Sequence, residues 1–202
     1  MAQRAHRYDC WYDSLSRVYS VTMTKALYVR KAMHAFLALA FGFVASWGTL
    51  EQVLTLAALI AVVFVAGYGV QALDPLRRAE RKSIGELFFV AGAVCTALIT
   101  LPVAPDAFLV AMLVLGLADT SASIVGRVCG GRSYMIFGEV RTYGGSFTVL
   151  VLTAVILGIF GMPAHTAIAA GWLLAAVEAL SPRGSDNFVL PVLGALLYIW
   201  LV

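Results

Sequence analysis

The chain alternates between long runs without a formal charge and short polar segments that hold nearly all of its charges. A helix that crosses a bilayer needs about 20 mostly apolar residues. Six runs reach or approach this length: residues 32–50, 52–73, 87–105, 107–126, 142–177 and 187–202. The only formal charge within them is Asp119, in the fourth run. The fifth run is too long for one helix and divides at residues 161–165, where glycine and proline occur together. The pattern therefore predicts an all-α, polytopic membrane protein with seven transmembrane helices.

The composition leads to the same class of protein. Hydrophobic residues make up 61% of the 202 residues and charged residues only 12%, whereas soluble domains carry about 25% charged residues. These values exclude an ordinary soluble globule, a disordered chain and a disulfide-rich secreted scaffold. Cys10, Cys95 and Cys129 lack the spacing of a zinc site or a disulfide framework.

The cations lie on one side of the predicted membrane. All 14 lysines and arginines occur in the N-terminal segment or in the connections after the second, fourth and sixth spans. The other connections hold only Glu51, Asp106 and His165 among their ionisable residues. By the positive-inside rule, the N-terminus is cytoplasmic and the C-terminus lies outside. We therefore expect a multi-pass protein of the cytoplasmic (inner) membrane, with its active site facing the cytoplasm.

The first 30 residues differ from the rest of the chain. They lack the apolar core and small-residue cleavage site of a signal peptide. Aromatic and aliphatic residues at helical spacing, mixed with Arg17 and Lys25, predict an amphipathic helix over residues 8–28 on the inner leaflet. We divide the chain into an interfacial segment, residues 1–30, and a transmembrane catalytic domain, residues 31–202.

One stripe of polar residues follows the fourth predicted span. Asp119, Ser123 and Arg127 recur every four residues, so a helix would align them on one face. Ionisable groups at membrane depth are costly and are functional candidates by default. A carboxylate suits Mg²⁺ and an arginine suits phosphate oxygens. The alternative is that Asp119 and Arg127 form a pair that neutralises itself inside the bundle.

Two further clusters are predicted at the same membrane side. Glu178, Asp186 and Asn187 make the connection after the sixth span rich in oxygen ligands, although a plain polar turn would also explain it. Residues 141–146 (Arg-Thr-Tyr-Gly-Gly-Ser) open the fifth span. A glycine-rich turn at a helix N-terminus presents free N–H groups that favour phosphate, but two glycines alone are a weak signal.

The remaining clusters are basic. Arg30, Lys31 and His34 share one helical face at the start of the first span, where snorkelling of the cations is an equally simple explanation. Arg81 and Lys82 belong to a group of four cations that precedes Glu86. Such a group would attract phosphates or anionic head groups, or would only determine topology.

Taken in order, these clusters resemble the CTP-dependent lipid-alcohol kinases, the polytopic family that contains phytol kinase, dolichol kinase and fungal-type diacylglycerol kinase. Its Gly-Asp-x-x-Ala-Ser-x-x-Gly-Arg stretch is met by residues 118–127, with Ala118 for the first glycine. Its Lys-Ser-x-Glu-Gly-Ser stretch is met by residues 141–146, with Arg141 for lysine and Gly144 for glutamate. Its Glu-Ala-x-Ser-x-x-Gly-x-Asp-Asn stretch matches residues 178–187, and its Arg-Lys-x-x-His start matches residues 30–34.

The resemblance implies transfer of the γ-phosphoryl group of CTP to the hydroxyl of a membrane-embedded lipid alcohol, with Mg²⁺ as cofactor. Asp119 would bind the metal together with Glu178 or Asp186, and Asp186 or Glu178 would be the general base. Nucleotide and phosphate contacts are expected from Ser123, Arg127, Arg132, Arg141, Thr142, Gly144, Gly145, Ser146, Asn187 and Lys82. Substrate or support residues are expected to be Arg30, Lys31, His34, Arg81 and Glu86. This chain has Gly144 where the family has a glutamate. The role of that glutamate is therefore either lost here or taken over by Glu139 or Glu86.

Two other functions stay open at this point. A cytidylyltransferase of the CDP-lipid synthase kind would use CTP and Mg²⁺ but release pyrophosphate. A small transporter is disfavoured because the ionisable residues cluster at one face and do not continue across the bilayer. Polyprenol, phytol or a similar isoprenoid, and diacylglycerol are all possible acceptors, since apolar walls encode tail shape poorly. The expected partners are the lipid alcohol, CTP and membrane lipids, without nucleic acid.

Overall fold

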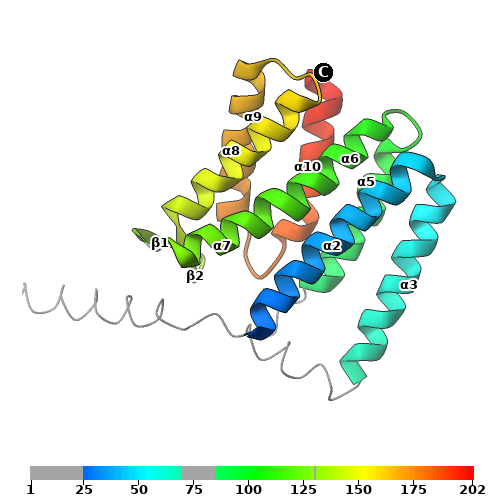
Figure 1. Cartoon of the computed structure of the whole chain (residues 1–202), viewed down its shortest axis with the longest axis horizontal. Coiled ribbons are helices and arrows are strands. Elements are labelled where there is room, and N and C mark those ends of the chain that lie inside the picture. Colours follow the sequence, from blue (N-terminus) through cyan, green and yellow to red (C-terminus); the bar gives the residue numbers. More distant parts are fainter. Residues whose placement is uncertain (1–24, 70–84, 130) are drawn as a thin grey trace, which may run out of the picture.

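The computed structural model describes residues 25–69, 85–129 and 131–202, which form a bundle of seven helical rods and one small hairpin (Figure 1). The amphipathic helix predicted over residues 8–28 lies outside the described residues except for its last four positions, and Arg81 and Lys82 lie outside them as well. In chain order the elements are α2 (Lys25–Trp47), α3 (Leu50–Gly69), α5 (Gly85–Thr100), α6 (Pro105–Leu113), η2 (Val114–Asp119), α7 (Thr120–Val128), β1 (Ser133–Ile136), β2 (Glu139–Thr142), α8 (Tyr143–Ile159), α9 (Ala164–Leu180) and α10 (Asp186–Leu201).

The number of rods is consistent with the seven predicted spans. Within the described residues, three segments are long and apolar enough to cross a membrane: Tyr28–Trp47, Leu50–Gly67 and Pro105–Val128. The other four helices, α5, α8, α9 and α10, have 16 or 17 residues. At 1.5 Å per residue they reach about 24–26 Å, slightly less than the hydrocarbon thickness of a typical bilayer.

The rod α6–η2–α7 is the centre of the bundle. Phe108, Met112 and Leu115 are completely buried there, and α2, α5, α8 and α10 all pack against this rod. Its middle, η2, is a π-helical turn that ends at Asp119. Wide turns of this kind occur often at functional sites.

The predicted break between the fifth and sixth spans is confirmed. The helix α8 ends at Ile159 and α9 begins at Ala164. Gly161 adopts a φ of +91°, and the amide of Met162 donates to the carbonyl of Leu157 at 3.0 Å. A left-handed glycine with this hydrogen bond is the Schellman motif that ends many helices, and the proline that follows cannot extend the helix.

The expectation of an all-α chain is incomplete at one connection. The strands β1 and β2 pair antiparallel, with Ile136 opposite Glu139 and Tyr134 opposite Arg141. The two residues between them, Phe137 and Gly138, have φ values of +49° and +79°. Two positive φ values are what the tightest hairpin turns require. The hairpin holds Arg141 and Thr142 in fixed positions just before α8.

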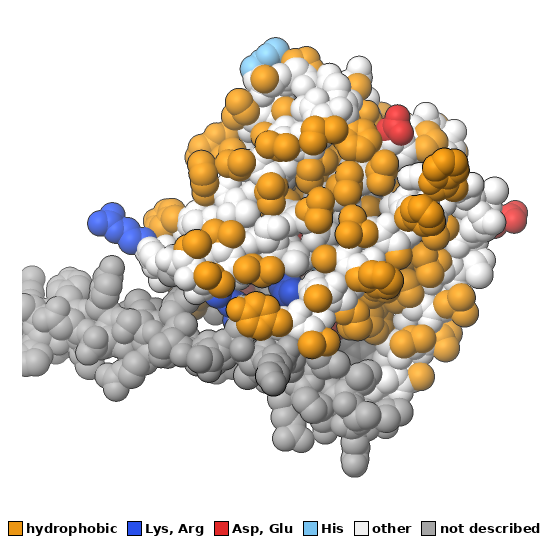
Figure 2. Space-filling model, in the orientation of Figure 1, with side chains coloured by type: hydrophobic (Ala, Val, Ile, Leu, Met, Phe, Trp, Pro, Cys, Tyr) orange, Lys and Arg blue, Asp and Glu red, His pale blue; other side chains and the backbone are white. Residues whose placement is uncertain are grey.

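The outer surface of the bundle is apolar. Figure 2 shows hydrophobic side chains over most of the visible face, with few charged ones among them. Large exposed side chains occur on several helices, as a lipid-facing surface requires: Phe36, Phe43, Leu59, Val62, Val63, Trp172 and Trp200. Figure 1 shows the hairpin, the start of α2 and the α9–α10 connection at one end of the bundle. The α2–α3, α5–α6 and α8–α9 turns lie at the other end.

Candidate active site

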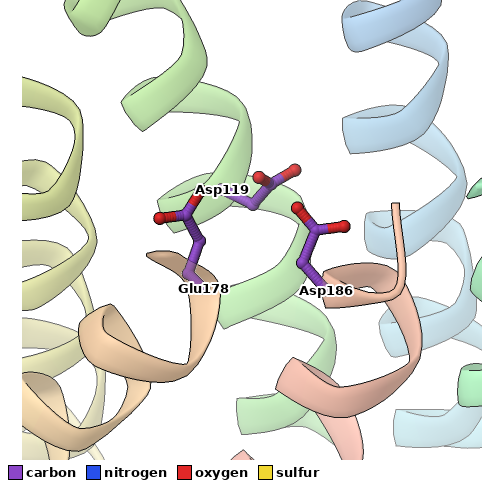
Figure 3. A group of neighbouring side chains, drawn as sticks. All are labelled: Asp119, Glu178 and Asp186. Carbon is purple, nitrogen blue, oxygen red and sulfur yellow. The ribbon is translucent and has the colours of Figure 1, made fainter. Parts of the chain in front are cut away.

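Three carboxylates from three different helices meet inside the bundle. Asp119 ends the π-helical turn η2, Glu178 lies near the end of α9, and Asp186 begins α10. One ligand oxygen from each can be chosen so that all three lie within 4.8 Å of one another, and all three residues are buried (Figure 3). The convergence of Asp119 with Glu178 and Asp186, which the resemblance implied, is therefore observed.

Two cations from other elements hold these carboxylates. The ammonium of Lys31, on α2, lies 3.1 Å from Oδ2 of Asp119. The guanidinium of Arg141, on β2, contacts Glu178, lies 3.6 Å from Oδ2 of Asp186 and donates to the carbonyl of Ser181 at 2.9 Å. The pairing of Asp119 with Arg127, which the sequence left open, is replaced by the pair with Lys31.

The neighbouring carboxylates stabilise the positively charged form of Arg141. Burial alone would lower the pKa of Arg141, but the carboxylates of Glu178 and Asp186 outweigh this effect and raise the pKa above its usual value. Three carboxylates meet two cations in this cluster. Either a proton or a further cation, such as a metal ion, would balance the charge of the third carboxylate.

A polar cavity of about 330 Å³ opens beside Glu178. This volume is within the range of small-molecule sites. The cavity lies between α7, the hairpin and the start of α8, and Arg127 and Arg141 bring positive charge to it. Among the residues predicted from the sequence, those that line it are Ser123, Arg127, Arg141, Thr142, Gly145, Ser146 and Glu178.

Small residues let the walls of this cavity approach one another. A Cβ at Gly126 would collide with Oγ1 of Thr142, and a Cβ at Gly145 would lie 2.9 Å from the same atom. That hydroxyl caps α8 by accepting a hydrogen bond from the amide of Gly145 at 3.0 Å. The Gly145 amide thus already donates to Thr142, although the sequence had suggested that it would donate to a phosphate.

A second, much smaller cavity shares no lining residue with the first. It measures about 10 Å³ and is lined by Arg30, Met33, His34, Leu37, Phe64, Gly85, Glu86, Phe89 and Asn187. Arg30 pairs with Glu86 at 3.4 Å. The side-chain amide of Asn187 donates to the carbonyl of Gly85 at 3.0 Å, and its backbone amide donates to Asp186.

Three of the predicted nucleotide and phosphate contacts lie elsewhere. Arg132 is exposed and precedes the hairpin, and Gly144 is half-buried at the start of α8; neither lines the larger cavity. Asn187 lines the smaller cavity and not the larger one. Glu86 lines the smaller cavity with Arg30, so it does not replace the family glutamate near Gly144. Glu139 does line the larger cavity, on the same strand as Arg141.

Sequence reasoning missed the contribution of Tyr134. Its hydroxyl lies 2.5 Å from Oγ of Ser146, and its ring packs against Tyr143 with centroids 5.0 Å apart. This contact ties the hairpin to the first turn of α8. The strands have only four residues each, too few for a convincing two-residue alternation.

Comparisons with known proteins agree with this arrangement. The chain is 30% identical over 162 residues to the phytol kinase of Synechocystis sp., covering 70% of this chain and 69% of that protein. No family model and no solved structure matches the chain. The aligned length and identity, together with the buried carboxylates at the motif positions, establish that the chain belongs to the lipid-alcohol kinase family that includes phytol kinase.

Proposed function

We propose that the protein transfers the γ-phosphoryl group of CTP to the hydroxyl of a lipid alcohol within the membrane, with Mg²⁺ as cofactor. The observation that carries the proposal is the cluster of Asp119, Glu178 and Asp186 beside a polar cavity. The kinship with a phytol kinase supports a lipid-alcohol acceptor. The choice of CTP rests on the resemblance of the motifs to the CTP-dependent family.

The donor set suits Mg²⁺. Magnesium prefers hard oxygen ligands at about 2.0–2.1 Å, so oxygens on opposite sides of the ion are about 4.2 Å apart. The three carboxylate oxygens lie within 4.8 Å, close to that spread. We assign Asp119 and Glu178 as ligands, with Asp186 as the alternative second carboxylate. The bound ion would neutralise charge on the phosphate oxygens of the nucleotide.

The larger cavity is proposed to hold CTP. Arg127 and Arg141 supply forked donors that match phosphate oxygens, and Ser123 and Ser146 add hydroxyl groups. Catalysis of phosphoryl transfer is mostly positioning and charge neutralisation. The two arginines would fix the triphosphate so that its terminal phosphorus faces the carboxylates.

In the proposed reaction, the oxygen of the alcohol forms a bond to the γ-phosphorus, and the bond between that phosphorus and the bridging oxygen of CDP breaks. The alcohol proton passes to the carboxylate of Asp186 or Glu178. The products are CDP and the phosphorylated lipid. Under the predicted topology, CTP would arrive from the cytoplasm and the alcohol from the inner leaflet.

The test is a product analysis with purified protein in lipid nanodiscs. CTP and ATP labelled at the γ-position are incubated with phytol, a polyprenol, farnesol and diacylglycerol in separate reactions. A kinase places the label on the lipid and releases CDP or ADP. Release of labelled pyrophosphate with formation of a CDP-lipid would overturn the proposal in favour of a cytidylyltransferase. Uptake of solute into sealed proteoliposomes of the same protein, without any phosphorylated product, would favour the transporter.

A matched pair of variants links the reaction to the site. Glu178→Gln removes one carboxylate of the cluster, whereas Glu51→Gln removes an exposed one at the other end of the bundle. We expect the first variant to lose at least two orders of magnitude in turnover, the usual effect of removing a positioned acid–base or charge-stabilising group. The second should retain normal turnover.

A further inference from the structure

The smaller cavity has the size and lining of a hydroxyl site. Its volume of about 10 Å³ is close to the space that one water-sized oxygen occupies. Polar groups from Arg30, Glu86 and Asn187 line one part, and Leu37, Phe64 and Phe89 supply apolar walls. A site with one polar end and apolar walls suits the head of an alcohol with a long hydrocarbon chain.

His34 has a buried ring nitrogen, Nε2, to which the proposed reaction has assigned no role. Its Nε2 is inaccessible to solvent and has no hydrogen-bond partner among the described residues. The ring is held edge-on to Phe89, with centroids 4.5 Å apart, and it lines the smaller cavity. A buried ring nitrogen without a partner costs free energy, so such an atom calls for a ligand oxygen.

The smaller cavity adjoins residues that neighbour the carboxylate cluster, and it is separate from the larger cavity. Lys31, three residues before His34 on α2, contacts Asp119, and Asn187 follows Asp186 directly. The larger cavity approaches the cluster from the side of Glu178, and the two cavities share no lining residue. Attacking and leaving oxygens must lie roughly in line in phosphoryl transfer. Separate donor and acceptor sites, one bordered by Glu178 and the other by Asn187, are compatible with this demand.

We propose that the smaller cavity, between α2 and α5, binds the hydroxyl of the lipid alcohol through a hydrogen bond that the Nε2–H of His34 donates to the hydroxyl oxygen, which leaves the hydroxyl proton for Asp186 or Glu178. This inference rests on the proposed function, because it assigns the acceptor site of the same reaction. The hydrocarbon chain would leave past Leu37 and Phe64 toward the apolar surface of α2 and α3, where Phe36, Val62 and Val65 are exposed.

The first test separates acceptor binding from donor binding. In His34→Leu the hydroxyl loses a buried hydrogen bond. We expect the KM for the alcohol to rise about tenfold or more, while the KM for CTP stays within about twofold. His34→Gln, which places an amide nitrogen near the position of Nε2, should recover part of the loss. His165→Leu, an exposed histidine at the opposite end of the bundle, is the matched control.

The second test does not depend on turnover. An isoprenoid alcohol with a diazirine next to its hydroxyl is photolysed with the full-length protein in nanodiscs, and a diacylglycerol analogue is used in parallel. Labelled peptides from α2 or α5, protected by excess alcohol and not by excess CTP, would support the site. Labelling confined to α7 or α8, or a rise in the KM for CTP alone, would overturn it. If the wild-type protein transfers no phosphoryl group, the proposed function fails, and the labelled position still decides the binding site.

Discussion

Replacing Arg141 tests how the carboxylate cluster is held together. The guanidinium reaches Glu178, Asp186 and the carbonyl of Ser181 at once. In Arg141→Gln, two buried carboxylates lose their shared cation, and the described contacts leave only Lys31 to balance the cluster, through Asp119. We expect the variant to be less stable, chiefly because Glu178 is then buried without a counter-charge.

The magnitude follows from the burial of the pair. Removing one partner of a buried ion pair costs about 3–5 kcal/mol of unfolding free energy. The Arg141 side chain is 20% exposed, so we expect the lower end, about 3 kcal/mol, for Arg141→Gln. Glu178→Gln should cost less, about 1–2 kcal/mol, because Arg141 keeps Asp186 and Ser181. The double variant has no orphaned charge at position 178, so its loss should be about 2 kcal/mol smaller than the sum.

The assay is equilibrium unfolding in mixed micelles, followed by tryptophan fluorescence, for the wild type, both single variants and the double variant. Arg141→Gln combined with Glu51→Gln is the control cycle, since Glu51 is exposed at the other end of the bundle. The control should be additive within about 0.5 kcal/mol. Additivity of the Arg141–Glu178 cycle within the same margin would show that the pair does not stabilise the site, and the electrostatic reasoning would be wrong.

Three other predictions concern the same region. Asp119→Asn should abolish turnover, whereas Asp106→Asn, an exposed carboxylate at the other end of the same rod, should not change it; normal turnover in Asp119→Asn would exclude its role as a metal ligand. Mg²⁺ at about ten times its Kd should raise the unfolding free energy of the wild type by about 1.4 kcal/mol, and this shift should vanish in Asp119→Asn in calorimetry. Gly126→Ala should cost about 1–3 kcal/mol because its Cβ meets Oγ1 of Thr142, while Gly158→Ala, where the space is open, should stabilise α8 by up to about 1 kcal/mol; equal unfolding midpoints for the two variants would contradict the close approach of α7 and α8.

The helices of the bundle could be predicted from the sequence because most apolar runs are long and are separated by polar residues, glycine or proline. The division of residues 142–177 is one example. Gly161 and Pro163 end the helix through their own backbone conformations, so no distant contact is needed to predict the break. The hairpin could not be predicted in this way. Its strands are short, and its turn uses Phe137 at a positive φ, a conformation that a phenylalanine rarely adopts without support from its surroundings.

The candidate site could be predicted in part. Asp119, Glu178 and Asp186 could be identified because burying a carboxylate at membrane depth costs free energy and therefore indicates a function. The structure brings the three side chains together. Which cation contacts which carboxylate could not be predicted, because the partners come from distant parts of the chain. Lys31 and Asp119 are separated by 88 positions, and Arg141 and Glu178 by 37. Spacing along one helix suggested Arg127 for Asp119, but packing between α2 and η2 decides the contact.

The widened turn η2 determines where the central rod can change its length. One residue of an α-helix corresponds to about 100° of rotation. Adding or removing a residue within α6 or α7 would therefore turn one half of the rod away from its neighbours. The π-helical turn instead accommodates one extra residue, so deleting a single residue between Val114 and Ala118 would let the rod close into regular α-helix with both halves facing as they do now. Relatives should therefore tolerate the loss of one residue in this turn better than a change of length in α6 or α7.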